Sequence, residues 1–331
     1  MTPLRCALAL LAAAGLYGQT STRTFHLTTA QNGPALSEIA TILKNVGNIQ
    51  QISGDDVKFE ITVSGSETDL ATAAWLIDHL DTNVRQPAQY SVPDSSDVVS
   101  IVYPSNTPTM AGFNEIITSL RTVGKVTHIF NFTSARAITM RTTGDQTQLA
   151  SWLVRQMDVS ADDKDRWQEP RVYTIPGNPQ EIVKVVYLIH PTKQPANLNE
   201  MVTVLRTIAD LRSIFTRSEP QGIAFRGTVA QVQLGDWLFQ QLDVQPDAQM
   251  SAQTHEYTTP ETEDSITRVY YLNNGGMNSH MNEVIRAVRS EANIRRVFTY
   301  IAARALAIRG NADAVAAADR IIKQQDTTSA Q

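Results

Sequence analysis

The chain has 331 residues, of which 42% are hydrophobic and 18% are charged, and its formal net charge is -5 at pH 7. The length predicts roughly two to four compact domains, and the apolar content excludes an intrinsically disordered chain. The negative charge argues against a nucleic-acid-binding protein, which needs a basic face.

The first predicted element is a signal peptide over residues 1–18. Arg5 is followed by an apolar run from Ala7 to Tyr17 and then by small and polar residues, which is typical of export signals. A retained membrane anchor is the alternative, although the run is shorter than the roughly 20 residues that a membrane span needs. Cys6 is the only cysteine and lies in this segment, where Pro3, Leu4 and Arg5 do not give a lipoprotein context. We therefore expect a periplasmic or otherwise extracytoplasmic protein without disulfides.

A repeat organises the rest of the chain. The segment WLIDHLD at 75–81 returns as WLVRQMD at 152–158 and WLFQQLD at 237–243, and a weaker copy, DRIIKQQD, ends at Asp326. A period of this length is typical of small domains in tandem. The predicted modules are residues 19–86, 87–160, 161–246 and 247–331.

Each module begins with a strand and a helix. The predicted strands cover 25–27, 98–103, 183–189 and 266–272, which are rich in β-branched and aromatic residues. Apolar residues with offsets 0, 3, 4 and 7 then predict one buried helix face. These residues are Leu36, Ile39, Ala40 and Leu43; Phe113, Ile116, Ile117 and Leu120; Leu198, Met201, Val202 and Leu205; and Met281, Val284, Ile285 and Val288.

Two strands and a second helix follow. The second strand ends at a Gly that we expect to permit a tight turn, and the next residue is a predicted helix N-cap. The Gly and N-cap pairs are Gly65–Ser66, Gly144–Asp145, Gly227–Thr228 and Gly310–Asn311. The residues that recur in the second helix are apolar, which indicates packing. Arg320 replaces the recurring Trp in the last module, and terminal repeats are often atypical.

One polar residue also recurs, the Asp that ends the second helix (Asp81, Asp158, Asp243 and Asp326). A carboxylate at a helix C-terminus opposes the helix dipole. We expect it to lie just past the last turn and to accept from N–H groups of the outgoing linker. A shared ligand contact is the alternative. The linkers QYSVP, VYTIP and EYTTP, which begin at 89, 172 and 256, predict a short extra edge strand before each following module.

The predicted fold class is α+β: four tandem βαββα modules, each a small mixed sheet with two helices packed on one face. Between residues 24 and 326 this order resembles the periplasmic, KH-like, ring-forming repeats of bacterial secretins, in the helix FNEIITSLRTVG and the helices that close on Leu-Asp. The chain lacks the secretin channel domain. The resemblance implies an envelope protein, such as an accessory of secretion or pilus assembly, that binds protein partners or itself through module faces and sheet edges.

No catalytic, cofactor-binding or metal-binding residue is predicted. The six His residues lack zincin spacing, and we expect His79 to be solvated and His128 to be structural. The loop NNGGMNSH at 273–280 predicts a plain turn rather than an anion cradle, and Asp162, Asp163 and Asp165 predict a solvated linker rather than a calcium site. KH-type nucleic-acid binding needs a basic GXXG loop, which the sequence lacks. We expect a non-enzymatic scaffold. The alternative is a ligand-binding or hydrolytic protein with its site at a module junction.

A glutamate recurs in each first helix: Glu38, Glu115, Glu200 and Glu283. The favoured interpretation is a carboxylate in the first helical turn that the helix dipole stabilises. The other is a charged ridge through which one module docks on the next.

Overall fold

The computed structural model describes residues 20–160, 162–163, 171–245, 253–260, 262–273 and 278–328. The predicted signal peptide, Asp165 and residues 274–277 of the predicted turn lie outside this part of the chain. Module 1 contains β1 (Ser21–His26), α1 (Gly33–Asn45), β2 (Gln51–Asp55), β3 (Glu60–Gly65) and α2 (Glu67–Leu80). Module 2 contains β4 (Ala88–Ser91), β5 (Asp97–Val102), α3 (Met110–Thr122), β6 (His128–Phe132), β7 (Ala137–Thr143) and α4 (Gly144–Met157).

The last two modules repeat the order of module 2. Module 3 contains β8 (Arg171–Ile175), β9 (Asn178–Tyr187), α6 (Pro195–Ile208), β10 (Ser213–Ser218), β11 (Gln221–Thr228) and α7 (Val229–Leu242). Module 4 contains β12 (Thr254–Thr258), β13 (Ile266–Tyr271), α8 (Asn278–Glu291), β14 (Arg296–Tyr300), a 3-10 turn (Ile301–Ala303), β15 (Ala305–Gly310) and α9 (Ala312–Thr328).

The predicted α+β class and βαββα order are confirmed, and one detail is corrected. Every strand pair is antiparallel, so the sheets are not mixed. The predicted edge strands exist as β4, β8 and β12, which give modules 2, 3 and 4 a fourth strand. The sheet of module 1 has the order β1-β3-β2, whereas that of module 2 has the order β4-β5-β7-β6.

The second helices begin with side-chain caps. Ser66 forms a capping box with Asp69, and Thr228 forms one with Gln231. In module 2 the predicted N-cap is wrong, because Thr143 precedes α4 and Asp145 lies inside it. In module 1 the Gly before the N-cap also has another cause than the predicted turn, whereas Gly144 of module 2 lies inside α4 rather than at the end of the strand. A Cβ on Gly65 would lie 2.7 Å from the carboxylate of Asp69, so this Gly makes room for the capping box.

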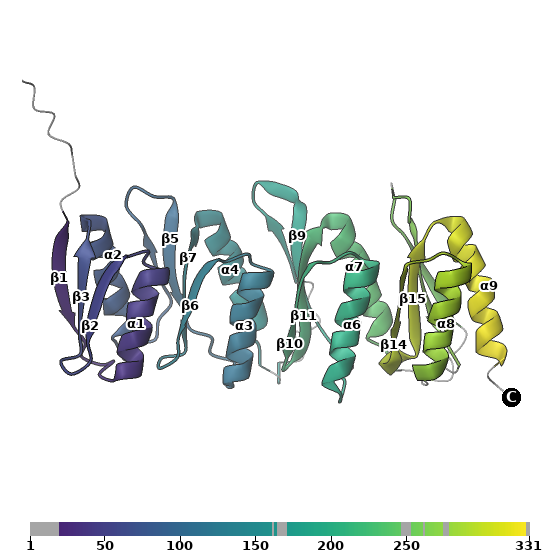
Figure 1. Ribbon diagram of the computed structural model, residues 1–331, viewed down its shortest axis with the longest axis horizontal. Coiled ribbons are helices and arrows are strands. Elements are labelled where there is room, and N and C mark those ends of the chain that lie inside the picture. The colour runs from purple at the N-terminus through teal and green to yellow at the C-terminus, as the bar shows by residue number, and fades with distance from the viewer. Residues whose placement is uncertain are drawn as a thin grey trace, which may run out of the picture.

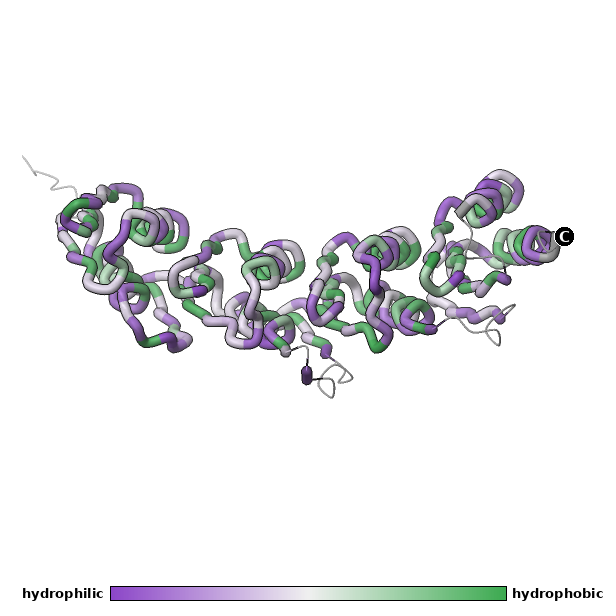
Figure 2. The backbone as a smooth tube through the Cα atoms, turned by 90° about the horizontal axis from the view of Figure 1, so that it is seen from below, coloured by the Kyte–Doolittle hydropathy of each residue, from purple (hydrophilic) through white to green (hydrophobic). Residues whose placement is uncertain are grey.

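The modules stack so that sheets and helix pairs alternate along the molecule. Figure 1 shows α1, α3, α6 and α8 in a row on one side, with α1, α3 and α6 each followed by the sheet of the next module, and Figure 2 shows that the four modules follow a shallow arc. Helix α1 packs on β6, α3 on β10 and α6 on β14. The hydrophobic core of each of the first three modules continues into the next sheet: Val99 and Ile101 of β5, for example, belong to the core of module 1. Each of those helix pairs is thus covered on both sides.

Among the residues that the structure describes, no helix is both long enough and apolar enough to cross a bilayer.

Candidate functional site

The polar residues that recur along the chain act inside and between modules. The Asp at the end of each second helix binds a loop of its own module, namely the loop that follows β1, β5, β9 or β13. Asp81 accepts from the N–H groups of Thr29 and Ala30, both at 2.7 Å, and Asp158 accepts from that of Ser105 at 2.7 Å. Asp243 accepts from the N–H of Ile189 at 2.6 Å. The prediction of backbone N–H donors was right, but the predicted outgoing linker was the wrong partner.

The same loop is bound in module 4, where Asp326 accepts from the N–H of Asn273 at 3.1 Å. Since α9 extends to Thr328, this Asp lies inside the last turn rather than past it. A carboxylate that accepts several N–H groups stabilises a loop that has no strand or helix partner for those donors. The recurring Asp therefore closes each module and serves as a structural residue.

The recurring glutamate joins one module to the next. Glu38 accepts from the N–H of Thr133 at 2.9 Å. Glu115 accepts from the N–H of Ser218 at 3.1 Å, and Glu200 accepts from that of Ile301 at 3.1 Å. Thr133, Ser218 and Ile301 occupy corresponding positions where the second-to-last strand of modules 2, 3 and 4 ends: Thr133 and Ile301 directly follow β6 and β14, and Ser218 is the last residue of β10.

The favoured first-turn interpretation of these glutamates is wrong, because α1 begins at Gly33 and the first turn of α1, α3, α6 and α8 contains no acidic residue. The docking interpretation is confirmed at the three junctions. Glu283 occupies the same position in α8, which belongs to the last module that the structure describes.

A recurring arginine on the sheet of the next module forms a second contact across each junction. Arg141 of β7 donates from Nη1 to the Gly47 carbonyl at 3.0 Å, and Arg309 of β15 donates from Nη1 to the Ile208 carbonyl at 3.0 Å. Arg226 of β11 reaches the Val123 carbonyl at 3.5 Å. These carbonyls lie at the C-terminal ends of α1, α6 and α3, where a cation is favoured by the helix dipole.

Arg141 and Arg226 are in turn paired with acids of their own sheet, and Arg309 donates from Nε to the Asp264 backbone carbonyl of its own module at 2.9 Å. Arg141 Nε lies 2.7 Å from Asp97, and Arg226 lies 2.7 Å from Glu181. The hydrogen bond from Arg226 lowers the pKa of Glu181. Burial and the neighbouring Arg296 lower the pKa of Arg309. Each arginine is therefore held in place before it reaches across the junction.

Tyrosines at the ends of β5, β9 and β13 form a third contact between modules. The hydroxyl of Tyr187 donates to the Gln156 carbonyl at 2.7 Å, and that of Tyr271 donates to the Gln241 carbonyl at 2.6 Å. Tyr103 donates in the same way to the His79 carbonyl at 3.2 Å. Burial raises the pKa of Tyr187 and of Tyr271 to about 12, so both remain neutral donors well above neutral pH.

The recurring Trp of the second helix contacts the aromatic residue of the following linker. Trp75 stacks on Tyr90 with ring centroids 5.5 Å apart, and Trp152 lies 5.3 Å from Tyr173. Trp237 lies 5.4 Å from Tyr257. Arg320 occupies the Trp position in module 4, where the chain provides no next linker strand. The predicted packing role of the Trp is confirmed. The Trp that recurs in the second helix and the Tyr that recurs in the linker contact each other.

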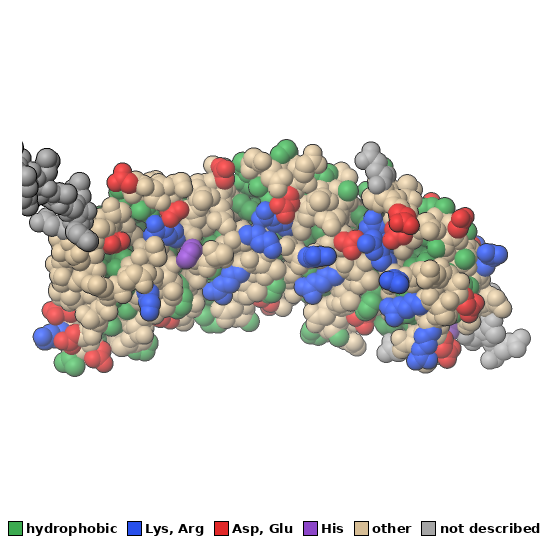
Figure 3. Space-filling model, turned by 45° about the horizontal axis from the view of Figure 1, so that its top comes forward, with side chains coloured by type: hydrophobic (Ala, Val, Ile, Leu, Met, Phe, Trp, Pro, Cys, Tyr) green, Lys and Arg blue, Asp and Glu red, His purple; other side chains and the backbone are tan. Residues whose placement is uncertain are grey.

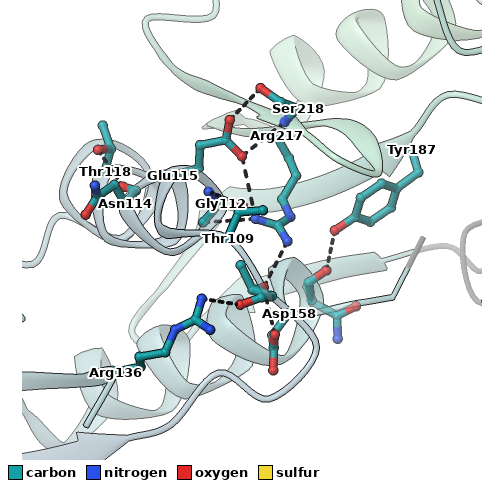
Figure 4. Close-up of polar contacts among 12 residues, drawn as sticks. Thr109, Gly112, Asn114, Glu115, Thr118, Arg136, Asp158, Tyr187, Arg217 and Ser218 are labelled. Carbon is teal, nitrogen blue, oxygen red and sulfur yellow. Dashed lines mark hydrogen bonds and ion pairs between the residues drawn. The ribbon is translucent and has the colours of Figure 1, made fainter. Parts of the chain in front are cut away.

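The junction between modules 2 and 3 has a charged centre. Arg217 of β10 is only 1% exposed, and Figure 4 shows its guanidinium between α3 and the loop before it. Nη1 donates to the Gly112 carbonyl at 2.9 Å and Nη2 donates to Oγ1 of Thr107 at 2.9 Å. Glu115 lies 3.5 Å away. Phe132 and Tyr300, both buried, occupy the corresponding positions in modules 2 and 4.

Thr107 connects this junction to the Asp that closes module 2. Its hydroxyl accepts from Arg217 and donates to Asp158 at 2.8 Å, and its carbonyl accepts from Arg136 at 2.9 Å. A cavity of about 430 Å³ opens beside this network, lined by Thr109, Glu115, Arg217 and Glu219 among others. This is the polar junction cavity that a ligand-binding alternative requires, but Glu115 and Arg217 of its lining are used to hold the two modules together.

The remaining candidates have structural surroundings. His79 is half-buried and stacks on Trp75 at 4.4 Å, so the prediction of a solvated side chain is wrong. His128 is exposed, and its Nδ1 lies 3.1 Å from the Asn45 carbonyl of module 1, which agrees with a structural role. Within the described ranges, no group of three His, Cys, Asp or Glu residues could hold a metal ion.

The outer face of the first sheet differs from those of the other three. In sheets 2, 3 and 4 this face docks on the preceding helices and carries buried residues such as Val99, Val185 and Val269. In sheet 1 the corresponding positions are polar: Thr22, Thr24 and His26 of β1 are exposed, and Glu60, Thr62 and Ser64 of β3 are partly exposed. Ser64 stands where the other modules have the junction arginine. This face has the composition of a solvated end.

Charges of both signs are distributed along the sides of the array. Figure 3 shows Lys and Arg side chains in a band along one face, with Asp and Glu beside them. Because the signs are interspersed, this face does not form the single-sign surface that a nucleic-acid site requires.

Comparisons with known proteins do not determine a family. No protein-family model and no curated protein matches the chain. Solved structures that match include ExeD of Aeromonas hydrophila, at 12% identity and a TM-score of 0.17, over 69% of this chain and 42% of that one. The type II secretion system secretin GspD of E. coli K12 matches at 13% identity and a TM-score of 0.17, over 69% of this chain and 39% of that one.

An aspartate kinase from Synechocystis matches at 12% identity and a TM-score of 0.18, over 92% of this chain and 54% of that one. The chain therefore spans about half the length of these proteins or less. TM-scores this low carry no argument about fold or function, so the secretin resemblance rests on the sequence pattern alone.

Proposed function

We propose that this protein is a non-enzymatic scaffold of the bacterial envelope, exported by its N-terminal segment, that holds protein partners at fixed positions along a rigid four-module array. The observation that supports it most strongly is the set of contacts repeated at all three junctions. The same Glu, Arg, Tyr and Trp positions join each pair of neighbouring modules. Because the same contacts recur at every junction, they hold neighbouring modules in a fixed relative orientation.

The contacts between modules occupy the charged side chains that a catalytic or binding site at a junction would direct toward its substrate or ligand. Glu115 is bonded to Ser218 and lies beside Arg217, and the guanidinium of Arg217 is occupied by Gly112 and Thr107. An active site instead presents titratable groups toward a substrate. The geometry thus favours the scaffold over the ligand-binding or hydrolytic alternative.

The array also leaves its sides available to partners. The first sheet presents a polar end face, and α8 has Glu291 where α1 and α3 have Val46 and Val123 at their C-terminal ends. Apolar residues suited to further stacking are thus replaced on the outward faces of the first and the last module that the structure describes. Partner contacts are expected along the sides, as secretion or pilus assembly accessories would require.

In-cell photo-crosslinking tests this proposal. A photoreactive residue at Val172, which is 45% exposed on β8, should give discrete protein adducts in the extracytoplasmic fraction of cells that express the full chain. The control places the same residue at Thr62 on the polar end face, where no adduct is expected. Retention of the protein in the cytoplasm, or an absence of protein adducts at Val172 and at Val84, a second exposed side position, would contradict the proposal.

A further inference from the structure

The first sheet lacks a strand that the other three sheets have. β1 corresponds to β5, β9 and β13, because each of them pairs with the strand that runs into the second helix. β5, β9 and β13 also pair on their other side with β4, β8 and β12. Within the described chain no strand pairs with β1 on that side.

The main chain of β1 directs hydrogen-bonding groups toward this open edge. The N–H of Leu27 donates to the Phe59 carbonyl of the neighbouring chain segment. Since bonded and non-bonded pairs alternate in an antiparallel ladder, every second residue before Leu27 bonds to β3. The residues between them direct their N–H and C=O groups away from β3: Thr22, Thr24 and His26.

Module 2 shows how these groups are used when the fourth strand is present. The N–H of Val92 donates to the Asp97 carbonyl, and by the same alternation Val99 and Ile101 bond to β4. Val99 and Ile101 correspond to Thr22 and Thr24. The open edge of β1 thus has the spacing and direction of donors and acceptors that bind β4 one module later.

A groove lies beside the open edge. A cavity of about 530 Å³ separates β1 from α2, and its lining includes Arg23, Phe25, Trp75, Ile77 and Asp78. The corresponding cavity of module 2, lined by Val154 and Arg155 of α4, has Ala88 and Gln89 of β4 as one wall. In module 1 that wall is missing.

We propose that the open edge of β1 binds an extended segment of a partner protein, which adds to the first sheet as an antiparallel fourth strand. The proposal rests on the partner-binding function inferred above and names the surface that one partner uses. Strand addition at an exposed edge is an established mode of peptide recognition, in which main-chain bonds supply affinity. Here the strands β4, β8 and β12 are three internal examples of the occupant.

The two faces of β1 define the side chains of that segment. On the outer face Thr22 and Ser64 share a hydrogen bond of 2.7 Å, and Thr24 and Thr62 share one of 2.9 Å. Hydroxyl side chains on the incoming strand extend these cross-strand pairs. On the inner face the segment covers Phe25 beside Arg23, which favours apolar and acidic side chains. The partner segment therefore alternates small hydroxyl residues with apolar or acidic ones.

Amide exchange measured by NMR on the full chain tests the edge, with a peptide of residues 86–93, QPAQYSVP, as the probe. In the free chain the amides of Thr22 and Thr24 should exchange fast and that of Phe25 slowly. Millimolar peptide should slow the exchange of Thr22 and Thr24 at least about tenfold, because their N–H groups become bonded. Unchanged exchange at saturating peptide would overturn the proposal.

Two substitutions at one position provide the matched comparison. Thr24→Pro removes an N–H that faces the open edge without removing a backbone bond to β3, so it should abolish the slowing at Thr22; both variants lose the hydroxyl that bonds Thr62. Thr24→Val keeps the N–H and should retain it. Equal protection in both variants would overturn the proposal.

A chain variant removes the dependence on peptide affinity. Residues 87–96, which contain β4 and its turn, are placed directly before Thr20, so that the strand is tethered to β1 at high effective concentration. Thr22 and Thr24 should then be protected. Protection of both amides in the unmodified free chain would overturn the proposal, because the edge would already be filled. Failure of these tests leaves the crosslinks at Val172 unaffected, so it is distinguishable from failure of the scaffold function.

Discussion

The junction between modules 2 and 3 and the junction between modules 1 and 2 share their backbone docking but differ at the centre. In the first, Arg217 is buried against Glu115 and the Gly112 carbonyl. In the second, Phe132 is buried at the corresponding position. The facing helices differ in the same sense, since α3 carries buried Ser119 where α1 carries buried Ile42.

The difference shows which contacts determine the geometry. The Glu, Arg, Tyr and Trp contacts at the edge of the interface are the same at every junction, so they fix how one module sits on the next. The centre tolerates an aromatic ring or a guanidinium. A buried charge stabilises only when it is fully paired, and it is costly once one partner is lost. The polar junction should therefore be the one most sensitive to single substitutions.

The largest expected effect comes from the centre of the polar junction. Arg217→Ala should lower the free energy of unfolding by about 3–5 kcal/mol, because it removes a buried ionic partner. Arg217→Phe restores the residue type of the corresponding position in module 2 and should recover part of that loss. Chemical denaturation of the two variants measures both values. A loss below about 1 kcal/mol for Arg217→Ala would show that the contacts of Nη1 and Nη2 with Gly112, Thr107 and Glu115 contribute little to stability.

The tyrosine contacts predict a loss of stability in alkali. Burial holds the pKa of Tyr187 and Tyr271 at about 12 in the folded state, above the ordinary value of about 10. Their contribution is fully present below pH about 10 and is lost as the pH rises toward about 12, by at most roughly 2–3 kcal/mol for each residue. Denaturation midpoints measured between pH 9 and 12, with Tyr187→Phe as the comparison, test this; a pH-independent difference between the two chains would contradict it.

The glutamates provide a graded comparison between junctions. Glu115→Ala should cost about 2–3 kcal/mol, because Glu115 binds the Ser218 N–H and also faces Arg217. Glu38→Ala and Glu200→Ala should each lower the free energy of unfolding by about 1–1.5 kcal/mol, since Glu38 and Glu200 each bind a single backbone N–H. Equal losses in all three would show that the charged centre adds nothing to this contact.

The smallest effect is expected at the end of the array. Glu283→Ala should change the free energy of unfolding by less than about 0.5 kcal/mol, because the described part of the chain has no module after module 4 on which α8 could dock. The same denaturation experiment measures it. A loss as large as that of Glu38→Ala would indicate that α8 is docked on something in solution.

Sequence patterns predicted the parts that depend on neighbouring residues. The order of elements and the edge strands β4, β8 and β12 follow from local periodicity and from Pro and Gly positions. The partner of the recurring Asp and the role of the recurring Glu did not follow, because the bonded residues lie 51 to 54 and 95 to 103 positions away. Local reasoning had to choose partners near in sequence, and it chose wrongly in both cases.

Two signals in the sequence could have revealed the junctions. Trp75, Trp152 and Trp237 recur only where a linker Tyr follows, and Arg320 breaks the pattern where none does. Arginine is likewise present at three corresponding strand positions and is replaced by Ser64 in the module without a predecessor. A residue that disappears together with a neighbouring module indicates a contact with that module. The role of Arg217 could not be inferred in this way, because it is a single exception among Phe132, Arg217 and Tyr300 at corresponding positions.

The central claim is that the three junctions hold the four modules as one rigid unit. Trp75, Trp152 and Trp237 each report on a different junction, so urea unfolding followed in single-tryptophan chains, with the other three of the four tryptophans replaced by Phe, tests it most directly. The account predicts coincident midpoints at the three junctions, and a separation of the Trp75 and Trp237 midpoints when Arg217→Ala is added. Three separate midpoints in chains that retain Arg217 would contradict it.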